Sequence, residues 1–530
     1  MKEICSLIRQ YILREKKAIS FILILSLIIG LTNILQPYIT GSFIDTLLLK
    51  LEEKMFLIKY FAIFTILSGL IILLAYINNI MSVKVTTKIA YNINRDLISH
   101  LQSISISTLK KYDIAYLTQK INEDANQVTS YVVDLISNIH VNFILLGFCL
   151  IYTLVMSKVL FLLFFVIILI YVLLYCAMRN RLYDTGYEFK EKQSVFFGHL
   201  TEQLKLNILI KGMSLNNFVM KRLDRSFAEL LSKLMPFQKR SYLFNSLDNM
   251  MAILSQISVF VVGGLLIFNG KITVGDFTIL ASYMNILQSS FKYFFELGGK
   301  TQSVRISSNR IQEIYNLPMD SNGDIVVDQI NEISIKNVEL YYDDVPIANN
   351  ITAKLNKGKI YGIVGKNGKG KSSLISAIVG MNESFRGSIE INGKNVKSIN
   401  MKKARKEIIS ICEQEVQLFQ DTIESNIKLD NNFENAELDR VINRFNLRDI
   451  YEINGNIDQL SGGEKRKIAC IRTLLKRCDL LIFDEPTANL DEESKNCLFK
   501  YLESKKEQQI IVIVSHDIDI MKHIDEVIEL

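Results

Sequence analysis

The chain has 530 residues, which is too many for a single compact core, so we expect two or three domains. Its 61 lysines and arginines only slightly exceed its 55 aspartates and glutamates, and they form no basic block, so we expect no nucleic-acid partner. Seven cysteines form no CxxC pair, which excludes a disulfide framework. Long apolar runs before a soluble-type C-terminal part predict a multi-domain membrane protein instead.

Residues 1–17 precede the first apolar run and mix apolar with basic side chains. The apolar ones recur at helical spacing, namely Ile4, Leu7, Ile8, Tyr11 and Ile12. This pattern predicts an amphipathic helix on the inner membrane surface, in contact with the lipid bilayer. A solvated N-terminal tail is the alternative.

Six apolar stretches follow, each close to the roughly 20 residues that a helix needs to cross a bilayer core of about 30 Å. They cover residues 18–35, 60–76, 135–156, 159–178, 250–268 and 277–297. The sixth is the most polar, because it contains Asn285, Lys292 and Glu296, but a membrane span is still the favoured interpretation. We therefore expect an all-α transmembrane domain with six helices over residues 18–312.

Basic residues are distributed unevenly among the loops. Residues 82–134 and 178–247 carry many lysines and arginines, whereas the loops after the first, third and fifth spans carry only one or two each. The positive-inside rule therefore predicts a multi-pass protein of the cell membrane with both termini in the cytosol. Helical periodicity within 89–101 predicts that the membrane helices continue into the cytosol.

Polar residues also occur in or at the edges of the spans. They are Asn78, Asn79, His140, Asn142, Asp248, Asn249 and Gln256. Such residues either face a cavity or bond neighbouring helices, and the sequence leaves both alternatives open.

A linker over residues 313–329, rich in turn-forming residues, leads to a soluble domain over residues 330–530. An apolar strand at 359–364 runs directly into a GxxxxGK[ST] loop and a helical pattern follows, which is the setting that this phosphate-binding motif requires. The loop consists of Gly365, Lys366, Asn367, Gly368, Lys369, Gly370, Lys371, Ser372 and Ser373. Its backbone N–H groups can surround phosphates, with Lys371 reaching the β- and γ-phosphates and Ser372 binding Mg²⁺. We expect an α/β P-loop NTPase domain with ATP and Mg²⁺ as cofactors.

A second apolar strand, at 479–483, ends at Asp484 and Glu485. Open α/β sheets bind their ligands at this end of the strands. We assign Asp484 to the Mg²⁺ shell and Glu485 to the catalytic base that accepts a proton from the attacking water. An acidic pair alone could merely begin a loop, so the assignment depends on the phosphate loop.

Between these motifs lies the run Leu-Ser-Gly-Gly-Glu at 460–464. Ser461 and Glu464 have the spacing of a helix capping box, which alone would explain the pattern. Together with Gly462 and Gly463, the same helix N-terminus can form a second anion site. One nucleotide does not need two phosphate sites in one subunit, so we expect this site to bind the ATP of a partner.

Residues 330–530 resemble the nucleotide-binding domain of ABC transporters, whose signature is the LSGGE run, and the whole chain is similar to bacterial half-transporters of the exporter type. The resemblance implies that Tyr342 stacks on adenine, that Gln414 is the Q-loop glutamine, which contacts Mg²⁺ and the membrane domain, and that His516 is a catalytic residue holding the γ-phosphate. Asp491, in the run 488–491, matches the D-loop. The resemblance also implies force-transmitting helices near residues 109–117 and 215–219.

The implied function is ATP-driven export across the cytoplasmic membrane by alternating access. A homodimer is expected because none of the site motifs is damaged, although pairing with a different chain stays open. Import by the same architecture and a non-hydrolysing, nucleotide-gated channel or regulator are the alternatives, and Glu485 and His516 argue against the second. The expected substrate is a peptide or another amphipathic compound, with a drug or a lipid also open.

Overall fold

The computed structural model describes residues 2–49, 54–109, 112, 114–320, 322–342, 345–366, 368–382, 384–431, 433–453, 457–515 and 518–530. It forms two compact units, and each is described by itself below. The first, the membrane unit, comprises Met1–Ser99 and Ile114–Asn316, and the second, the nucleotide unit, comprises His100–Asp113 and Leu317–Leu530.

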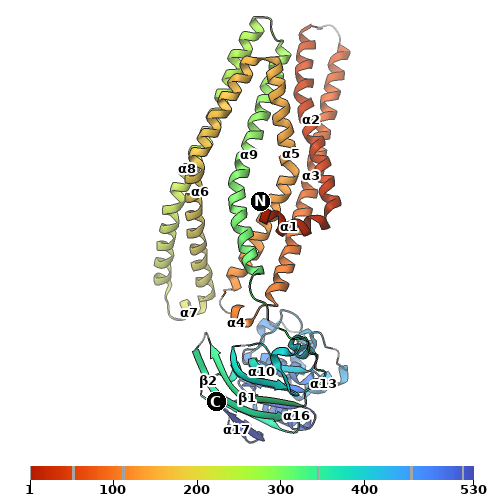
Figure 1. Cartoon of the computed structure of the whole chain (residues 1–530), viewed down its shortest axis with the longest axis vertical. Coiled ribbons are helices and arrows are strands. Elements are labelled where there is room, and N and C mark those ends of the chain that lie inside the picture. The colour runs from red at the N-terminus through yellow and green to blue at the C-terminus, as the bar shows by residue number, and fades with distance from the viewer. Residues whose placement is uncertain are drawn as a thin grey trace. The chain divides into compact units, whose positions relative to one another are not determined.

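Six long helices build the membrane unit (Figure 1). They are α2 (Lys16–Leu49), α3 (Lys54–Leu101), α5 (Ile114–Met156), α6 (Lys158–Lys205), α8 (Asn216–Phe268) and α9 (Val274–Tyr315). α6 packs along α8, while α2, α5 and α9 pack against one another. α3 and α6 have 48 residues each, so each is about 70 Å long and extends well beyond a bilayer core of about 30 Å. These helices are long enough to continue past a bilayer, and their continuation into the cytosol stays a prediction.

Among the described residues, five helices are long and apolar enough to cross a membrane. They are Lys16–Leu48, Ile58–Leu101, Ile121–Met156, Lys158–Met178 and Asn216–Phe268, which contain the first five predicted spans. The sixth predicted span, 277–297, is helical as part of α9, but its polar residues keep that helix outside this group.

Short helices join the long ones. α7 (Asn207–Gly212) connects α6 to α8, and α4 (Ile106–Leu109) lies between α3 and α5. The force-transmitting helices expected near 109–117 and 215–219 stay a prediction, and within those ranges the described residues show α5 beginning at Ile114 and α8 at Asn216. Residues 100–115 and 205–216 contain no proline that would mark where one helix ends and the next begins.

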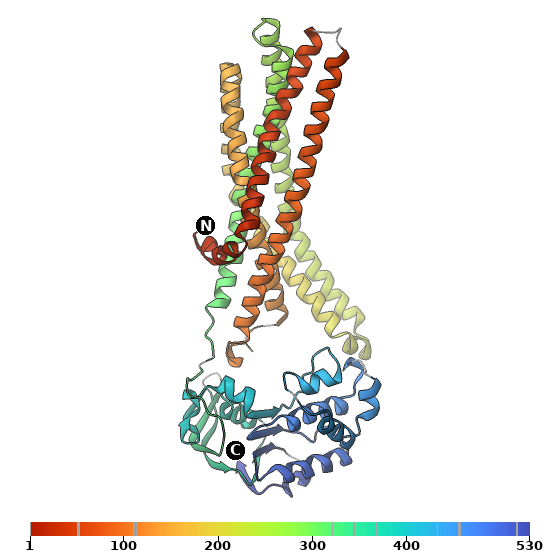
Figure 2. The same cartoon turned by 90° about the vertical axis from the view of Figure 1, so that its right-hand side faces the viewer.

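The N-terminal segment forms α1 (Lys2–Arg14), which crosses the long helices (Figures 1 and 2). Ile8 and Tyr11 are buried, and the Tyr11 hydroxyl donates to Asp96 Oδ2 at 2.9 Å and lies 3.4 Å from the Tyr315 hydroxyl. The predicted helix is present, and this part of its apolar face packs against protein rather than lipid.

The nucleotide unit contains two sheets. An antiparallel sheet has the order β2-β1-β4-β5, with β1 (Glu332–Tyr342), β2 (Val345–Asn356), β4 (Phe385–Ile391) and β5 (Lys394–Asn395). A parallel sheet has the order β6-β7-β8-β3-β9, with β3 (Ile360–Val364), β6 (Ile409–Cys412), β7 (Leu480–Asp484), β8 (Ile510–Val514) and β9 (Glu526–Glu529). β7 and β8 are buried along their whole length, as continuous apolar runs in a covered parallel sheet should be. The predicted α/β class is confirmed.

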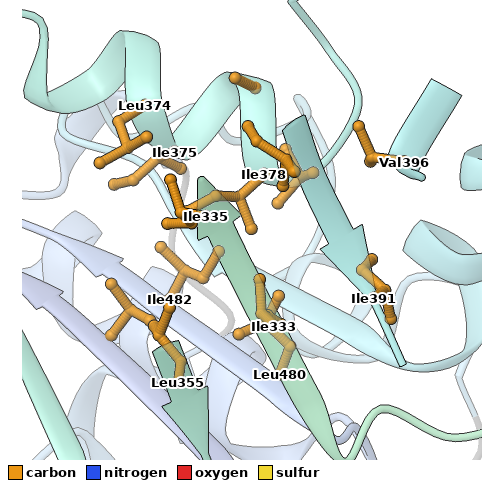
Figure 3. Close-up of a cluster of buried hydrophobic side chains, with 14 of the residues drawn as sticks. Ile333, Ile335, Leu355, Leu374, Ile375, Ile378, Ile391, Val396, Leu480 and Ile482 are labelled. Atoms are coloured by element: carbon orange, nitrogen blue, oxygen red, sulfur yellow. The ribbon is translucent and has the colours of Figure 1, made fainter. Parts of the chain in front are cut away.

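Helices cover these sheets. They are α10 (Lys371–Ile378), α11 (Met401–Glu407), α12 (Ile423–Lys428), α13 (Asn435–Arg444), α14 (Arg448–Ile453), α15 (Gly462–Leu475), α16 (Glu492–Lys505) and α17 (Ile518–Met521). Figure 3 shows Leu374 and Ile378 of α10 directed toward Ile335 of β1 within one apolar cluster. Each fully buried leucine or isoleucine contributes about 1.5–3 kcal/mol, so this cluster fixes α10, and with it the loop at its N-terminus.

The segment before α4 belongs to the nucleotide unit. Ile104 is buried and forms an antiparallel bridge with Met319, and the Asp320 amide donates to the Ser103 carbonyl at 2.8 Å. The chain that leaves α3 is thus bonded to the chain that enters the nucleotide unit. From the sequence we had placed residues 100–113 in the membrane domain and residues 319 and 320 in the linker.

Candidate ATP hydrolysis site

The phosphate loop joins the end of β3 to the start of α10. Gly365 has φ +157°, and a Cβ there would lie 2.7 Å from the Leu530 carbonyl oxygen. Gly370 precedes α10 with φ +87°, a left-handed conformation that favours glycine. These two glycines allow the backbone to turn tightly into the helix N-terminus, where phosphate groups bind. Asn367 lies outside the described residues.

Lys371 closes this loop. Its Nζ donates to the Gly365 carbonyl at 2.8 Å and approaches the Lys366 carbonyl at 3.4 Å, and the residue is buried. The remaining loop residues, Gly368 and Lys369, are exposed, and Ser373 lies in the first turn of α10. The ammonium group therefore sits inside the loop, where a phosphate oxygen could replace the carbonyls as its partner.

Ser372 and Asp484 meet across the end of the parallel sheet. The Ser372 hydroxyl donates to Asp484 Oδ2 at 2.7 Å. Burial raises the pKa of Asp484, and the neighbouring Glu485 raises it further, while Ser372 and Lys371 act in the opposite direction. A hydroxyl and a buried carboxylate are the hard oxygen donors that Mg²⁺ prefers when substrate phosphates supply the other ligands. The residues fit the ion.

Glu485 and Gln414 form the next contact. Gln414 Nε2 donates to Glu485 Oε2 at 3.0 Å, and the Glu485 amide donates to the Val514 carbonyl at 2.8 Å. Glu485 has φ +50°, which is strained for a residue with a side chain and is typical of functional positions. The structure thus brings the expected base and the expected Q-loop glutamine together, directly beside Asp484.

Arg466 is a site residue that the sequence did not reveal. It is buried on α15 and donates to the carbonyls of Glu413 (2.7 Å) and Gln414. The signature helix therefore holds the backbone of the Q-loop. In the sequence, Arg466 is only an arginine two residues after the LSGGE run, and arginines are common on solvated helices, so nothing distinguishes it.

The LSGGE run begins α15 as the capping box that the sequence predicted. Glu464 N donates to Ser461 Oγ at 3.3 Å, and Ser461 N donates to Glu464 Oε2 at 2.6 Å. A Cβ on Gly463 would lie 2.7 Å from the Asn489 carbonyl oxygen, whereas one on Gly462 would lie 3.8 Å from Asn489 Nδ2. The N-terminus of α15 therefore packs closely on the D-loop.

The D-loop is also held by charge. Lys467 Nζ lies 2.6 Å from Asp491 Oδ2, and Asp491 caps α16 by accepting from the Ser494 amide at 2.8 Å. The bond from Lys467 and those from Ser494 lower the pKa of Asp491 to about 2. The signature helix is thus bonded to both the Q-loop and the D-loop.

Two further predicted site residues cannot be placed. His516 and the side chain of Tyr342 lie outside the described residues, although the backbone of Tyr342 ends β1. Their roles stay predictions.

Comparison with known proteins gives the class. The family model for the ABC transporter transmembrane region matches residues 19–291, more than half of the chain, and the ABC transporter model matches residues 348–488. The chain therefore belongs to the ABC transporter family, whose members couple ATP hydrolysis to transport. It is a multi-pass membrane protein with the architecture of a bacterial half-transporter of the exporter type, in which one membrane domain precedes one nucleotide-binding domain.

Individual relatives are distant but cover most of the chain. A protein of Staphylococcus aureus (strain bovine RF122 / ET3-1), provisionally named a multidrug export ATP-binding/permease protein, is 24% identical over 84% of this chain and 79% of its own length. The equivalent protein of strain NCTC 8325 / PS 47 is 23% identical over the same shares. The structure of a bacterial Atm1-family ABC exporter with ATP bound superposes with a TM-score of 0.84 at 17% identity, covering 97% of this chain and 93% of that chain. This likeness establishes the fold.

Proposed function

We propose that the chain is an ATP-driven exporter of the cytoplasmic membrane that works as a homodimer, with both termini and the nucleotide unit in the cytosol. The observation that carries the proposal is the pair of contacts from Ser372 to Asp484 (2.7 Å) and from Gln414 to Glu485 (3.0 Å). They preserve both a cation-binding and a base position, which a non-hydrolysing regulator would not need. The provisional naming of the relatives as multidrug exporters supports outward transport.

Each residue has a role in hydrolysis. Lys371 and the loop amides bind the β- and γ-phosphates, and Ser372 and Asp484 hold Mg²⁺, which neutralises charge that develops on the phosphates. Gln414 orients Glu485, whose carboxylate accepts the proton of the attacking water. His516 holds the γ-phosphate, and Tyr342 stacks on adenine. Ser461, Gly462 and Gly463 bind the γ-phosphate held by the partner subunit, which completes each site across a two-fold axis.

The direction of transport is tested in proteoliposomes. ATP added outside reaches only chains whose nucleotide unit faces outward, so export appears as ATP-dependent accumulation in the lumen. A fluorescently labelled, uncharged decapeptide is a suitable probe for the proposed peptide or amphipathic substrate. Accumulation that Glu485→Gln abolishes supports export, whereas ATP-dependent loss of preloaded peptide would establish import.

A further inference from the structure

The membrane unit contains a cavity of about 630 Å³ among α2, α3, α5 and α9. This volume is within the range of small-molecule sites, which is about 300–1,000 Å³. Six carboxamide, five hydroxyl and six apolar residues line it. The carboxamides are Asn33, Gln36, Asn78, Asn138, Asn142 and Asn285. Of the polar span residues that the sequence singled out, Asn78, Asn142 and Asn285 thus face the cavity.

Several of these polar groups have no protein partner in the described part of the chain. The side-chain amides of Asn33, Gln36 and Asn285 line the cavity and make no hydrogen bond there, and none of these three residues is buried. Unpartnered polar groups are costly at membrane depth, where helices otherwise use them to bond one another. A set of them lining one cavity offers pairing sites to a ligand that supplies both donors and acceptors.

The cavity lining carries no charged side chain among the described residues. Asp134, one helical turn before the lining residue Asn138, accepts from Asn138 Nδ2 at 2.7 Å and lies 3.9 Å from Lys300 Nζ. His140 is hydrogen-bonded to Ser26 at 3.0 Å, and Lys292 lines an adjoining pocket of about 190 Å³ that shares Ser289 with the cavity. An ionised ligand would therefore find no side chain of opposite charge in the cavity lining.

We propose that this cavity binds an electroneutral compound rich in amide N–H and C=O groups, such as an uncharged peptide, in preference to a cation or an anion of the same size. Carboxamide side chains both donate and accept, so they pair with peptide groups in the way that peptide groups pair with each other. This inference rests on the proposed function, because it names the substrate class of that transport.

Binding to the full chain in nanodiscs, without nucleotide, tests the inference independently of ATP turnover. Three capped decapeptides carry the same uncharged fluorophore and differ only by no charge, two lysines or two glutamates. We expect the neutral peptide to bind at least about tenfold more tightly than either charged one, the ratio that a single unpaired polar interaction produces.

Two variants sharpen this test. Asn285→Leu should weaken binding of the neutral peptide about tenfold, and Asn285→Asp should shift the preference to the lysine peptide. Asn79→Leu is the matched control, because Asn79 follows Asn78 on α3 but does not line the cavity. It should bind as the unchanged chain does.

Equal binding of all three peptides, no binding of the neutral one, or an unchanged preference in Asn285→Asp would overturn the inference. The proposed function fails on a different observation, namely the absence of ATP hydrolysis by the purified chain in lipid. A chain that hydrolyses ATP but prefers the lysine peptide would therefore contradict only the substrate class.

Discussion

Glu485 is the residue on which hydrolysis depends in the proposed mechanism. Its backbone is strained, and its carboxylate accepts a hydrogen bond from Gln414 Nε2. Glu485→Gln keeps the size and polarity of the side chain but cannot accept a proton. We expect ATP binding to be retained while turnover falls by about 10²–10⁴-fold. Steady-state ATPase and nucleotide-binding assays on the purified variant measure both quantities, and near-normal turnover would remove Glu485 as the base.

Asp484 illustrates the cost of a cation site before the cation binds. Burial raises the pKa of Asp484 in the folded protein above its value in the unfolded chain. The protonated carboxyl therefore stabilises the fold below the unfolded-state pKa, and this stability is lost as pH rises through the folded-state pKa. At neutral pH the charged carboxylate therefore destabilises the nucleotide-free fold. We expect Asp484→Asn to unfold at a higher temperature than the unchanged chain at pH 7, with a difference that shrinks in acid.

The same variant should lose the stabilisation that Mg²⁺ and ATP give the unchanged chain, because one of the Mg²⁺ ligands is gone. Thermal unfolding of the full chain, with and without the nucleotide, measures both effects. Asp430→Asn is the surface control, since Asp430 is 90% exposed and its charge is screened by water. A lower unfolding temperature for Asp484→Asn without nucleotide would contradict the argument.

Residues of the site differed in how well the sequence revealed them. Lys371, Ser372 and Asp484 were predictable because they follow buried strands of one parallel sheet, and the ends of such strands converge. Arg466 was not, because it contacts carbonyls more than 50 positions earlier in the chain, and no local pattern encodes such a contact. Asn33 and Gln36 escaped notice for a similar reason, since only the packed bundle shows which face of α2 meets a cavity.

Among the elements, α15 is bonded to both the Q-loop and the D-loop. Its capping box was predictable from four residues, because a cap is a local structure. Its packing on the D-loop was not, and it depends on Gly463. The sixth membrane helix shows the opposite case, since α9 is a complete helix although hydropathy alone does not mark it as a span.

The packing of α15 gives a matched pair of variants. A Cβ on Gly463 would lie 2.7 Å from a backbone oxygen, so Gly463→Ala should push α15 away from the D-loop and destabilise the nucleotide unit by about 1–3 kcal/mol. Gly462→Ala meets its nearest atom at 3.8 Å and should cause no such loss. Thermal unfolding of the nucleotide-free chain compares the two, and equal unfolding temperatures would show that the contact does not constrain the helix.

At the scale of the whole molecule, the proposed mechanism assigns phosphate binding to two separate helix N-termini of one chain. The phosphate loop precedes α10, and Ser461–Gly463 begins α15. In a two-fold symmetric dimer of identical chains, each nucleotide would contact the phosphate loop of one chain and Ser461–Gly463 of the other, as isologous pairing requires. The membrane cavity fits the same arrangement, because each chain would contribute one such lining to the dimer.

We therefore expect the chain, expressed alone and purified in lipid, to form a dimer of about twice 60.8 kDa that hydrolyses ATP. Ser461→Arg should abolish turnover while ATP still binds to the phosphate loop of the same chain, because the arginine occupies the site that faces the partner's nucleotide. Lys371→Ala should also abolish turnover, because it removes the phosphate-loop lysine from the half of the shared site that the same chain supplies.

Co-expression of these two inactive variants separates shared sites from sites within one chain. A mixed dimer joins the phosphate loop of the Ser461→Arg chain to the signature helix of the Lys371→Ala chain, which restores one complete site. With random pairing and independent sites, activity should return to about a quarter of that of the unchanged dimer. Activity in a monomer, unchanged turnover in Ser461→Arg, or turnover that requires a second, different chain would each contradict the homodimer.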